Sequence, residues 1–169
     1  MELMVSISVL GVVTAMAVPS FVNMSNRNRL ASQANELLSA IQYARAEAIR
    51  SNARITVCGA VSADADAEAD CSDGVHSYWV VIGRTGGAEQ QLRVFAVKDP
   101  MKVSTDLEKI SFTADGLARD STTKALVTGE ITVCLATSNP AQNKRVLNIA
   151  SGSRVVITTP EEDGGGTCS

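Results

Sequence analysis

The N-terminal third of the chain carries two successive hydrophobic patterns, and together they predict one long helix. Residues 3–26 contain no charged side chain, and residues 3–18 lack a polar face. A helix that spans a bilayer needs roughly 20 such residues. Apolar residues then recur at alternating steps of four and three, which is the spacing of one helix face. These positions are Leu30, Ala34, Leu37, Ile41, Ala44 and Ala48. We predict a helix over about residues 2–51, apolar all round in its first half and amphipathic in its second.

Pro19 lies inside this predicted helix, where it removes one backbone hydrogen bond, so we expect a kink without an end. The apolar stretch allows three interpretations: a buried core helix, a secretory signal peptide cleaved after Ala17, or a membrane helix that is retained. A signal peptide begins with positive charge, whereas this chain offers Glu2. The amphipathic continuation favours a retained membrane helix.

After residue 52 the pattern changes to short runs that are rich in β-forming residues. The runs are RITVCGAV, HSYWVVIG, LRVFAVK, KISFTA, EITVCLA, RVLNIA and SRVVITT. Turn-forming pairs such as Gly86-Gly87 and Asp115-Gly116 separate them. Seven short strands joined by turns predict an antiparallel sheet packed on the helix stripe, an α+β domain. We therefore divide the chain into residues 1–25, the apolar half-helix; 26–52, the amphipathic half-helix; and 53–169, the sheet domain.

Composition indicates the cellular compartment in which the chain folds and the kinds of partner that it attracts. The 169 residues are 45% hydrophobic and carry a net charge of −3, which gives no general attraction to nucleic acid or anionic surfaces. The four cysteines are Cys58, Cys71, Cys134 and Cys168, and none are in C-x-x-C spacing. A zinc site is therefore disfavoured, and two disulfides formed in an oxidising compartment are favoured.

No catalytic or metal-binding arrangement stands out. His76 is the only histidine and has no nucleophile motif with it, so we expect it at a strand edge, and we expect Trp79 in the core. The acidic run at 64–73 matches a calcium loop only in part, because Ala69 and Val75 stand where Gly and Glu are needed. We expect a solvated loop, no metal, no cofactor, no small-molecule substrate and no enzymatic activity.

The opening MELMVSISVLGVVTAMAVPSF resembles the N-terminus of type IV pilins and type II secretion pseudopilins. Mature members begin with a methylated Phe, then a short apolar stretch, a Glu, and a hydrophobic helix with a Pro near its end. The resemblance places Glu2 at that glutamate and Pro19 at that proline. The basic leader ending in Gly, and the Phe after it, are missing, so the resemblance implies that the natural chain starts before Met1.

The resemblance also implies a role for Glu2 in assembly. A lone carboxylate in hydrocarbon costs on the order of several kcal/mol unless a partner neutralises it. In pilins the implied partner is the N-terminal amine of a neighbouring subunit, which would set the register as a subunit joins the filament. The alternative is that Glu2 lies at the membrane interface and complements the helix N-terminus.

The rest of the chain resembles, more narrowly, the FimU/FimT and GspH-like branch of minor pilins. The matching segments are ARAEAIRSNARITVC, SYWVVIG, SFTADG and a cysteine near the C-terminus. Four cysteines allow three pairings. We expect Cys58–Cys71, which closes a short polar loop, and Cys134–Cys168, which would hold the C-terminal tail. The implied architecture is the pilin fold, a long N-terminal helix packed on antiparallel sheet.

The resemblance implies a structural minor pilin of a type IV pilus that acts in assembly or priming and in the tip complex. Its partners would be other minor pilins and the major pilin. Before assembly it would cross the inner membrane once, with its sheet domain in the periplasm, and it would then reach the pilus and the cell surface. An H-type minor pseudopilin of a type II system, serving protein secretion, is one alternative.

A DNA-binding minor pilin of the FimT kind is the other alternative. Some FimT-type relatives bind DNA for uptake through a Gly-Arg-x-Arg motif near the last strands. Here that stretch is ASGSRVVITT, which keeps Arg154 in altered spacing and has Val where the second Arg is expected. Lys144 and Arg145 are the other candidate contacts, although three acids at 161–163 oppose them. Phosphate binding needs several cations, so a hairpin turn with one exposed Arg is favoured.

Overall fold

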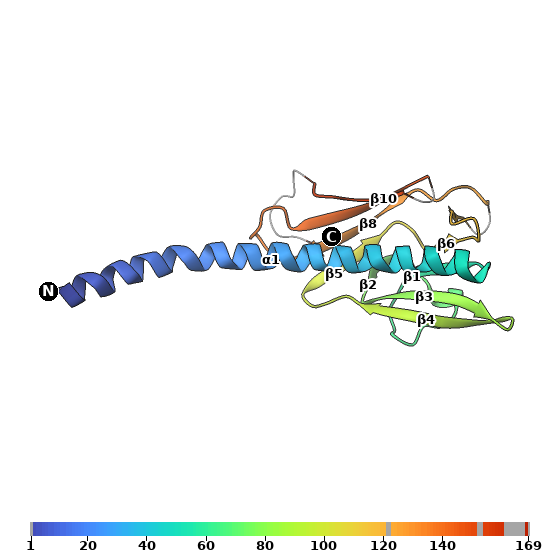
Figure 1. Cartoon of the computed structure of the whole chain (residues 1–169), viewed down its shortest axis with the longest axis horizontal. Coiled ribbons are helices and arrows are strands. Elements are labelled where there is room, and N and C mark those ends of the chain that lie inside the picture. Colours follow the sequence, from blue (N-terminus) through green and yellow to red (C-terminus); the bar gives the residue numbers. More distant parts are fainter. Residues whose placement is uncertain (1, 121–122, 152–153, 161–167, 169) are drawn as a thin grey trace.

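The longest element of the molecule is helix α1 (Glu2–Ser51), which projects beyond the rest of the chain at its N-terminal end (Figure 1). The structure is a computed structural model that describes residues 2–120, 123–151, 154–160 and 168, without the side chains of residues 2, 13–19 and 85. The helix continues past Pro19 and curves gently, with no break at that residue. The predicted single helix over about residues 2–51 is confirmed.

The predicted helix stripe forms the centre of the core. All six of its residues are 1% exposed or less, and Ala40 and Gln33 are buried beside them. Because Ala34, Ala40, Ala44 and Ala48 carry only a methyl group, the helix backbone approaches the strands closely. The second half of α1 is therefore an integral part of the sheet domain.

Two five-stranded sheets, both antiparallel throughout, pack on this half of the helix (Figure 1). The first has the order β4 (Ala88–Ala96), β3 (Tyr78–Thr85), β1 (Ile55–Ala60), β6 (Ile110–Phe112), β7 (Ala118–Arg119). The second has the order β10 (Arg154–Thr158), β9 (Lys144–Ala150), β8 (Gly129–Leu135), β5 (Met101–Thr105), β2 (Gly74–His76). The short helix η1 (Glu68–Asp70) lies in the loop between β1 and β2.

The α+β class and the seven predicted strands are confirmed, and the structure divides the strands between two sheets. The chain changes sheet between β1 and β2, between β2 and β3, between β4 and β5, between β5 and β6, and between β7 and β8. Turn residues indicate where a strand ends, and they carry no information about which sheet the next strand joins. Strands β2, β5 and β7, of two to five residues, were missed. The equally short β6 and β10 were found because each lies within a longer run of β-forming residues.

The two sheets meet where β1 passes β2. Gly59 of β1 forms an isolated bridge with Ser72, just before β2. The buried side chain of His76 in β2 lies over Gly59. A glycine is required here because a Cβ at position 59 would stand 2.0 Å from His76 Cδ2. Local contact at this glycine therefore joins the two sheets.

Candidate assembly surface and other candidate sites

In the part whose side chains the structure describes, the first half of α1 is a solvent-exposed apolar rod. No described side chain before Leu30 is buried. The exposed large apolar residues of this segment are Leu3, Met4, Val5, Ile7, Val9, Leu10, Val12, Phe21, Val22 and Met24. The Ser8 hydroxyl donates to the Met4 carbonyl at 2.8 Å, so this polar group is satisfied within the helix. An apolar surface of this extent indicates contact with lipid or with other proteins.

The two residues that the sequence places at the assembly surface are only partly visible. Glu2 opens α1 and Pro19 lies within it, but both side chains lie outside the described residues. Over the described part of the chain, no helix combines the length and the apolar character of a membrane span. The membrane segment and the roles of Glu2 and Pro19 stay predictions.

Three polar contacts hold the helix at the edge of the sheet domain. Asn26 Nδ2 donates to the Asn139 carbonyl at 2.7 Å. The buried Gln33 accepts from the Lys98 backbone N–H at 3.1 Å. Lys98 Nζ forms an ion pair with Glu36 at 3.0 Å. Sequence analysis missed this junction, although a glutamine beside the apolar stripe was a usable signal, because a buried amide needs a partner.

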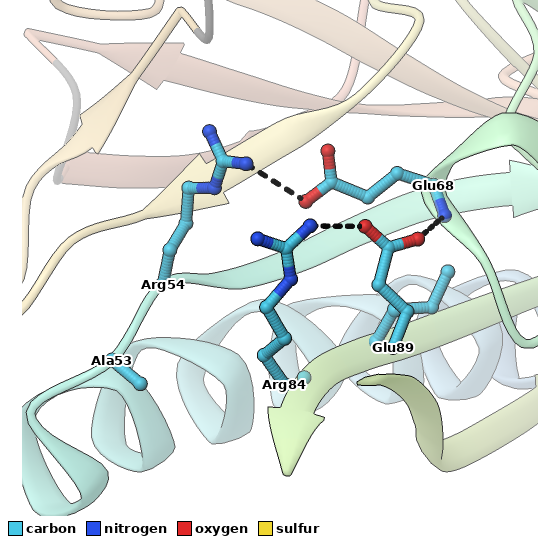
Figure 2. Close-up of a pocket in the computed structure, with 7 residues that line it drawn as sticks. Ala53, Arg54, Glu68, Arg84 and Glu89 are labelled. Atoms are coloured by element: carbon cyan, nitrogen blue, oxygen red, sulfur yellow. Dashed lines mark hydrogen bonds and ion pairs between the residues drawn. The ribbon is translucent and has the colours of Figure 1, made fainter. Parts of the chain in front are cut away.

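A cavity of about 290 Å³ near the start of β1 holds a network of paired charges (Figure 2). Arg84 pairs with Glu89 at 3.0 Å, and Arg54 with Glu68 at 3.6 Å. Glu89 Oε2 also accepts the Glu68 backbone N–H at 2.8 Å. That backbone bond and then Arg84 lower the pKa of Glu89. These charges are already paired with one another. The network holds η1 against the first sheet, and the cavity offers no unpaired reactive group among these residues.

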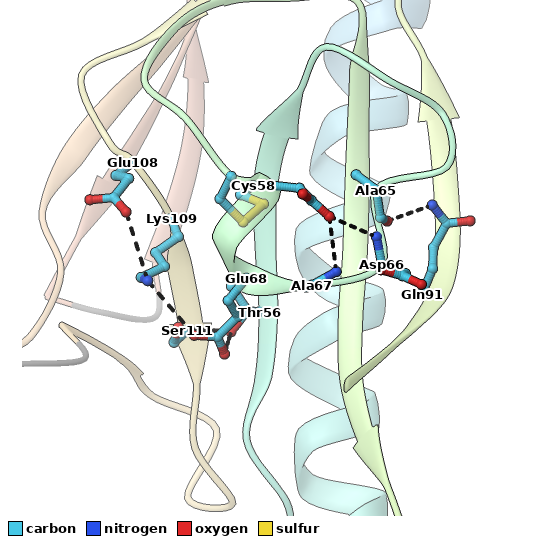
Figure 3. Close-up of a disulfide and its surroundings, with 12 residues drawn as sticks. Thr56, Cys58, Ala65, Asp66, Ala67, Glu68, Gln91, Glu108, Lys109 and Ser111 are labelled. Atoms are coloured by element: carbon cyan, nitrogen blue, oxygen red, sulfur yellow. Dashed lines mark hydrogen bonds and ion pairs between the residues drawn. A yellow bond between two sulfur atoms is a disulfide. The ribbon is translucent and has the colours of Figure 1, made fainter. Parts of the chain in front are cut away.

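In the acidic loop that follows β1, the backbone groups are bound by the side chains of Asp70 and Gln91 (Figure 3). Asp70 Oδ2 accepts the backbone N–H groups of Asp66 at 3.2 Å and Ala67 at 3.3 Å. Gln91 Nε2 of β4 donates to the Ala63 and Ala65 carbonyls at 2.7 and 2.8 Å. Across the described residues, no three acidic, cysteine or histidine side chains gather in a way that could hold a metal ion. The loop is fixed on the first sheet.

The structure contains the disulfides Cys58–Cys71 and Cys134–Cys168, which is the pairing expected from the sequence. Their Cα atoms are 5.5 and 5.7 Å apart. The first closes the acidic loop against β1. The second joins β8 to the C-terminal end of the chain, across the tail at 161–167 that lies outside the described residues.

His76 and Trp79 belong to the interior. Trp79 is buried in the main core, as expected, and its ring meets that of His76 edge-on at 6.3 Å. His76 lies at the end of the edge strand β2, and its side chain is only 3% exposed. Burial lowers the pKa of His76, while Asp73 opposes that shift. Local sequence gave no sign of this burial, because Gly59 makes the space for the ring.

The three candidate DNA contacts do not form one surface. Lys144 and Arg145 open β9, whereas Arg154 opens β10 and pairs with Ala150 at the far end of β9. At about 3.3 Å per residue, Lys144 and Arg154 are separated by roughly 20 Å along the strand direction. The half-buried Arg145 donates to the Lys144 carbonyl at 2.7 Å. The hairpin with one exposed Arg154 agrees with the favoured interpretation.

Comparisons with known proteins agree with this architecture. Residues 33–158 match the family described as type II transport protein GspH. A crystal structure of the type IV minor pilin FimU from Pseudomonas aeruginosa has a TM-score of 0.55 at 22% identity, covering 82% of this chain and 97% of that chain. A second crystal form has a TM-score of 0.52 at 22% identity, covering 78% and 98%. None of the curated proteins is similar enough in sequence to count as a match. The predicted pilin fold is confirmed.

Proposed function

Because the chain belongs to the GspH family and has the fold of a minor pilin, we propose that it is a structural minor pilin of a type IV pilus. Its partners are other minor pilins and the major pilin, and it acts in filament priming and in the tip complex. The inner membrane holds it before assembly, through a single helix that leaves the sheet domain in the periplasm.

The exposed apolar half of α1 carries this proposal. Residues 3–26 are uncharged and, at 1.5 Å per residue, extend about 36 Å. Asn26 donates a hydrogen bond to the sheet domain, and in the described part of the helix the first buried residue is Leu30. A rod of this length needs an apolar environment in every state of the protein. Lipid supplies that environment before assembly, and neighbouring pilin helices supply it in the filament.

A substitution at Glu2 tests membrane retention and filament assembly separately. In Glu2→Ala the apolar helix is retained, so the fraction of the chain in the membrane should equal that of the wild type. Incorporation into sheared pili should fall at least about tenfold, because the buried acid no longer pairs with the amine of its neighbour. Glu130→Ala, on the exposed face of β8, is the matched control. Normal incorporation of Glu2→Ala would remove the assembly role of this carboxylate.

The family match favours one alternative, an H-type minor pseudopilin of a type II secretion system, because its description names type II transport. Deletion of the gene distinguishes the two. Loss of surface pili with normal protein export supports the pilus, and loss of export with normal pili supports the secretion system. The identity of the neighbouring genes would also distinguish a pilus system from a secretion system.

DNA binding is the weaker alternative, because Arg154 stands apart from Lys144 and Arg145. A receptor that used Arg154 would retard duplex DNA, would lose affinity in Arg154→Ala, and would weaken steeply as salt rises. We expect no retardation that depends on Arg154 at physiological salt.

A further inference from the structure

Strand β2 lies in a short segment that is fixed beside the first sheet at both ends, and we call residues 72–76 the β2 flap. Before the flap, Cys71 forms the disulfide with Cys58 of β1. After it, the Ser77 carbonyl accepts the Val97 backbone N–H at 2.9 Å. The flap itself forms the edge of the second sheet, so this short segment bridges the two sheets.

One buried side chain holds the β2 flap on the core. His76 is 3% exposed, whereas the other residues of the flap are exposed or half-buried. Backbone pairing with β5 covers only the three residues of β2. The Ser72 N–H adds one bond to the Gly59 carbonyl of β1, at 3.2 Å. The packing of the flap therefore depends on one imidazole ring, which can take up a proton.

Uncharged groups from three strands pack on the ring of His76. The ring lies over Gly59 of β1, meets Trp79 of β3 edge-on at 6.3 Å between centroids, and stands opposite Val103 of β5. Burial lowers the pKa of His76, and the nearby charge of Asp73 opposes that shift. A charged imidazolium is costly in such a site, so protonation favours a state in which the ring has left it.

We propose that the β2 flap is a proton-operated device: protonation of His76 releases the flap from the junction of the sheets while the rest of the fold stays intact. The disulfide at Cys71 and the bond at Ser77 hold both ends, so the opening is local. Gly74, whose φ is +102°, gives the flap a residue about which the backbone can turn. Release leaves β5 as the edge of the second sheet, so acidity decides which strand forms that edge.

The lowered pKa of the buried ring sets the direction of the pH effect. In the open flap His76 is exposed and titrates near its ordinary pKa of about 6.5. As pH falls below that value, the open flap binds the proton before the closed flap does. The equilibrium constant for opening therefore rises by up to about tenfold per pH unit. The rise ends at the lower pKa of the closed form.

Hydrogen exchange of the full chain in a nonionic detergent, between pH 7.5 and pH 5.0, tests the proposal. After correction for the intrinsic exchange rate at each pH, protection of the flap amides should fall by up to about tenfold per pH unit below about pH 6.5. Amides of the central strands β1 and β8 should keep their protection. His76 is the only histidine, so its imidazole NMR signals report its titration directly, with a midpoint below about 6.5.

His76→Phe is the matched variant, because it keeps an aromatic ring over Gly59 and cannot take up a proton. Protection of its flap should not change with pH over this range. The proposal is overturned if the flap of the wild type keeps its protection at acidic pH, if β1 and β8 lose theirs by the same factor, or if His76→Phe shows the wild-type profile. If the variant does not fold, the comparison of the flap with β1 and β8 in the wild type still decides.

Discussion

The contact between His76 and Gly59 shows how single residues hold the two sheets together. A Cβ at position 59 would lie 2.0 Å from His76 Cδ2 and 2.3 Å from Cγ. The ring cannot move away easily, because Trp79 meets it edge-on. Among the described residues, neither nitrogen of His76 has a hydrogen-bond partner, so this histidine is held by packing alone.

Gly59→Ala should therefore destabilise the folded protein by about 1–3 kcal/mol, because the added methyl group overpacks the junction of the sheets. Urea unfolding measures the effect. The same substitution in a His76→Ala background is the control and should cost less, since the clashing ring is gone. Equal costs in both backgrounds would show that the two residues are not coupled.

His76 also predicts a dependence of stability on pH. Its pKa is lowered in the folded protein by burial, whereas in the unfolded chain it is about 6.5. As pH falls below that value, the unfolded chain binds the proton first, so the free energy of unfolding decreases by up to about 1.4 kcal/mol per pH unit. The loss continues down to the lower pKa of the folded state.

Urea unfolding of the wild type and of His76→Phe between pH 7.5 and pH 5.5 tests this expectation. The aromatic variant should show a flat profile over that range. Glu89 and Asp115 have lowered pKa values in the folded protein, so their contributions are lost only at more acidic pH, below about 4.5. A wild-type profile as flat as that of His76→Phe would contradict the role assigned to the histidine.

Among the elements, α1 was the most predictable, and its alanines explain how it packs. A stripe at alternating steps of four and three is a local property of the sequence, and the structure buries each member. Ala44 is fully buried between the helix and the strands, whereas Ala46, two residues on, is exposed. This pair allows a matched experiment on the helix face.

Ala44→Leu should destabilise the protein by about 1–3 kcal/mol, because three extra carbons must fit between helix and sheet. Ala46→Leu should change the free energy of unfolding by less than about 0.5 kcal/mol. Both substitutions keep a high helix propensity, so the difference reports packing. Similar costs for the two variants would mean that the helix face is wrongly oriented.

The strands were predictable where several β-forming residues follow one another in the sequence. The runs around Val57, Val81 and Val133 contain several β-forming residues in succession, and each became a central strand. β5 escaped because its five residues follow a loop and alternate over only two buried positions, Met101 and Val103. Its place beside β8 depends on backbone pairing with residues about 30 positions later, which local pattern does not report.

For the whole molecule, the division between a packed and an unpacked half of the helix makes a direct prediction. A chain that begins at residue 26 should keep the fold of the sheet domain, because every buried residue of α1 lies at Leu30 or beyond in the described part. Its free energy of unfolding should differ from that of the full chain in detergent by less than about 1 kcal/mol.

The truncated chain should also remain monomeric in water without detergent, as size-exclusion chromatography with light scattering would show, because its large apolar surface has been removed. The matched variant begins at residue 34, which deletes Leu30 and Gln33 together with Asn26. That variant should lose about 2–5 kcal/mol, the cost of removing a large buried side chain. Equal stability of the two truncations would contradict the proposed junction.

The sequence by itself determined the elements: a long helix with one buried face, an apolar half without charge, and strands separated by turns. These features are predictable because periodicity and turn chemistry act over a few neighbouring residues. The tertiary structure alone decided the split into two sheets, the burial of His76 over Gly59, and the hydrogen bond between Asn26 and the loop before β9. Each of these joins residues that are distant along the chain or in different sheets, and such pairings follow from the packing of the whole fold.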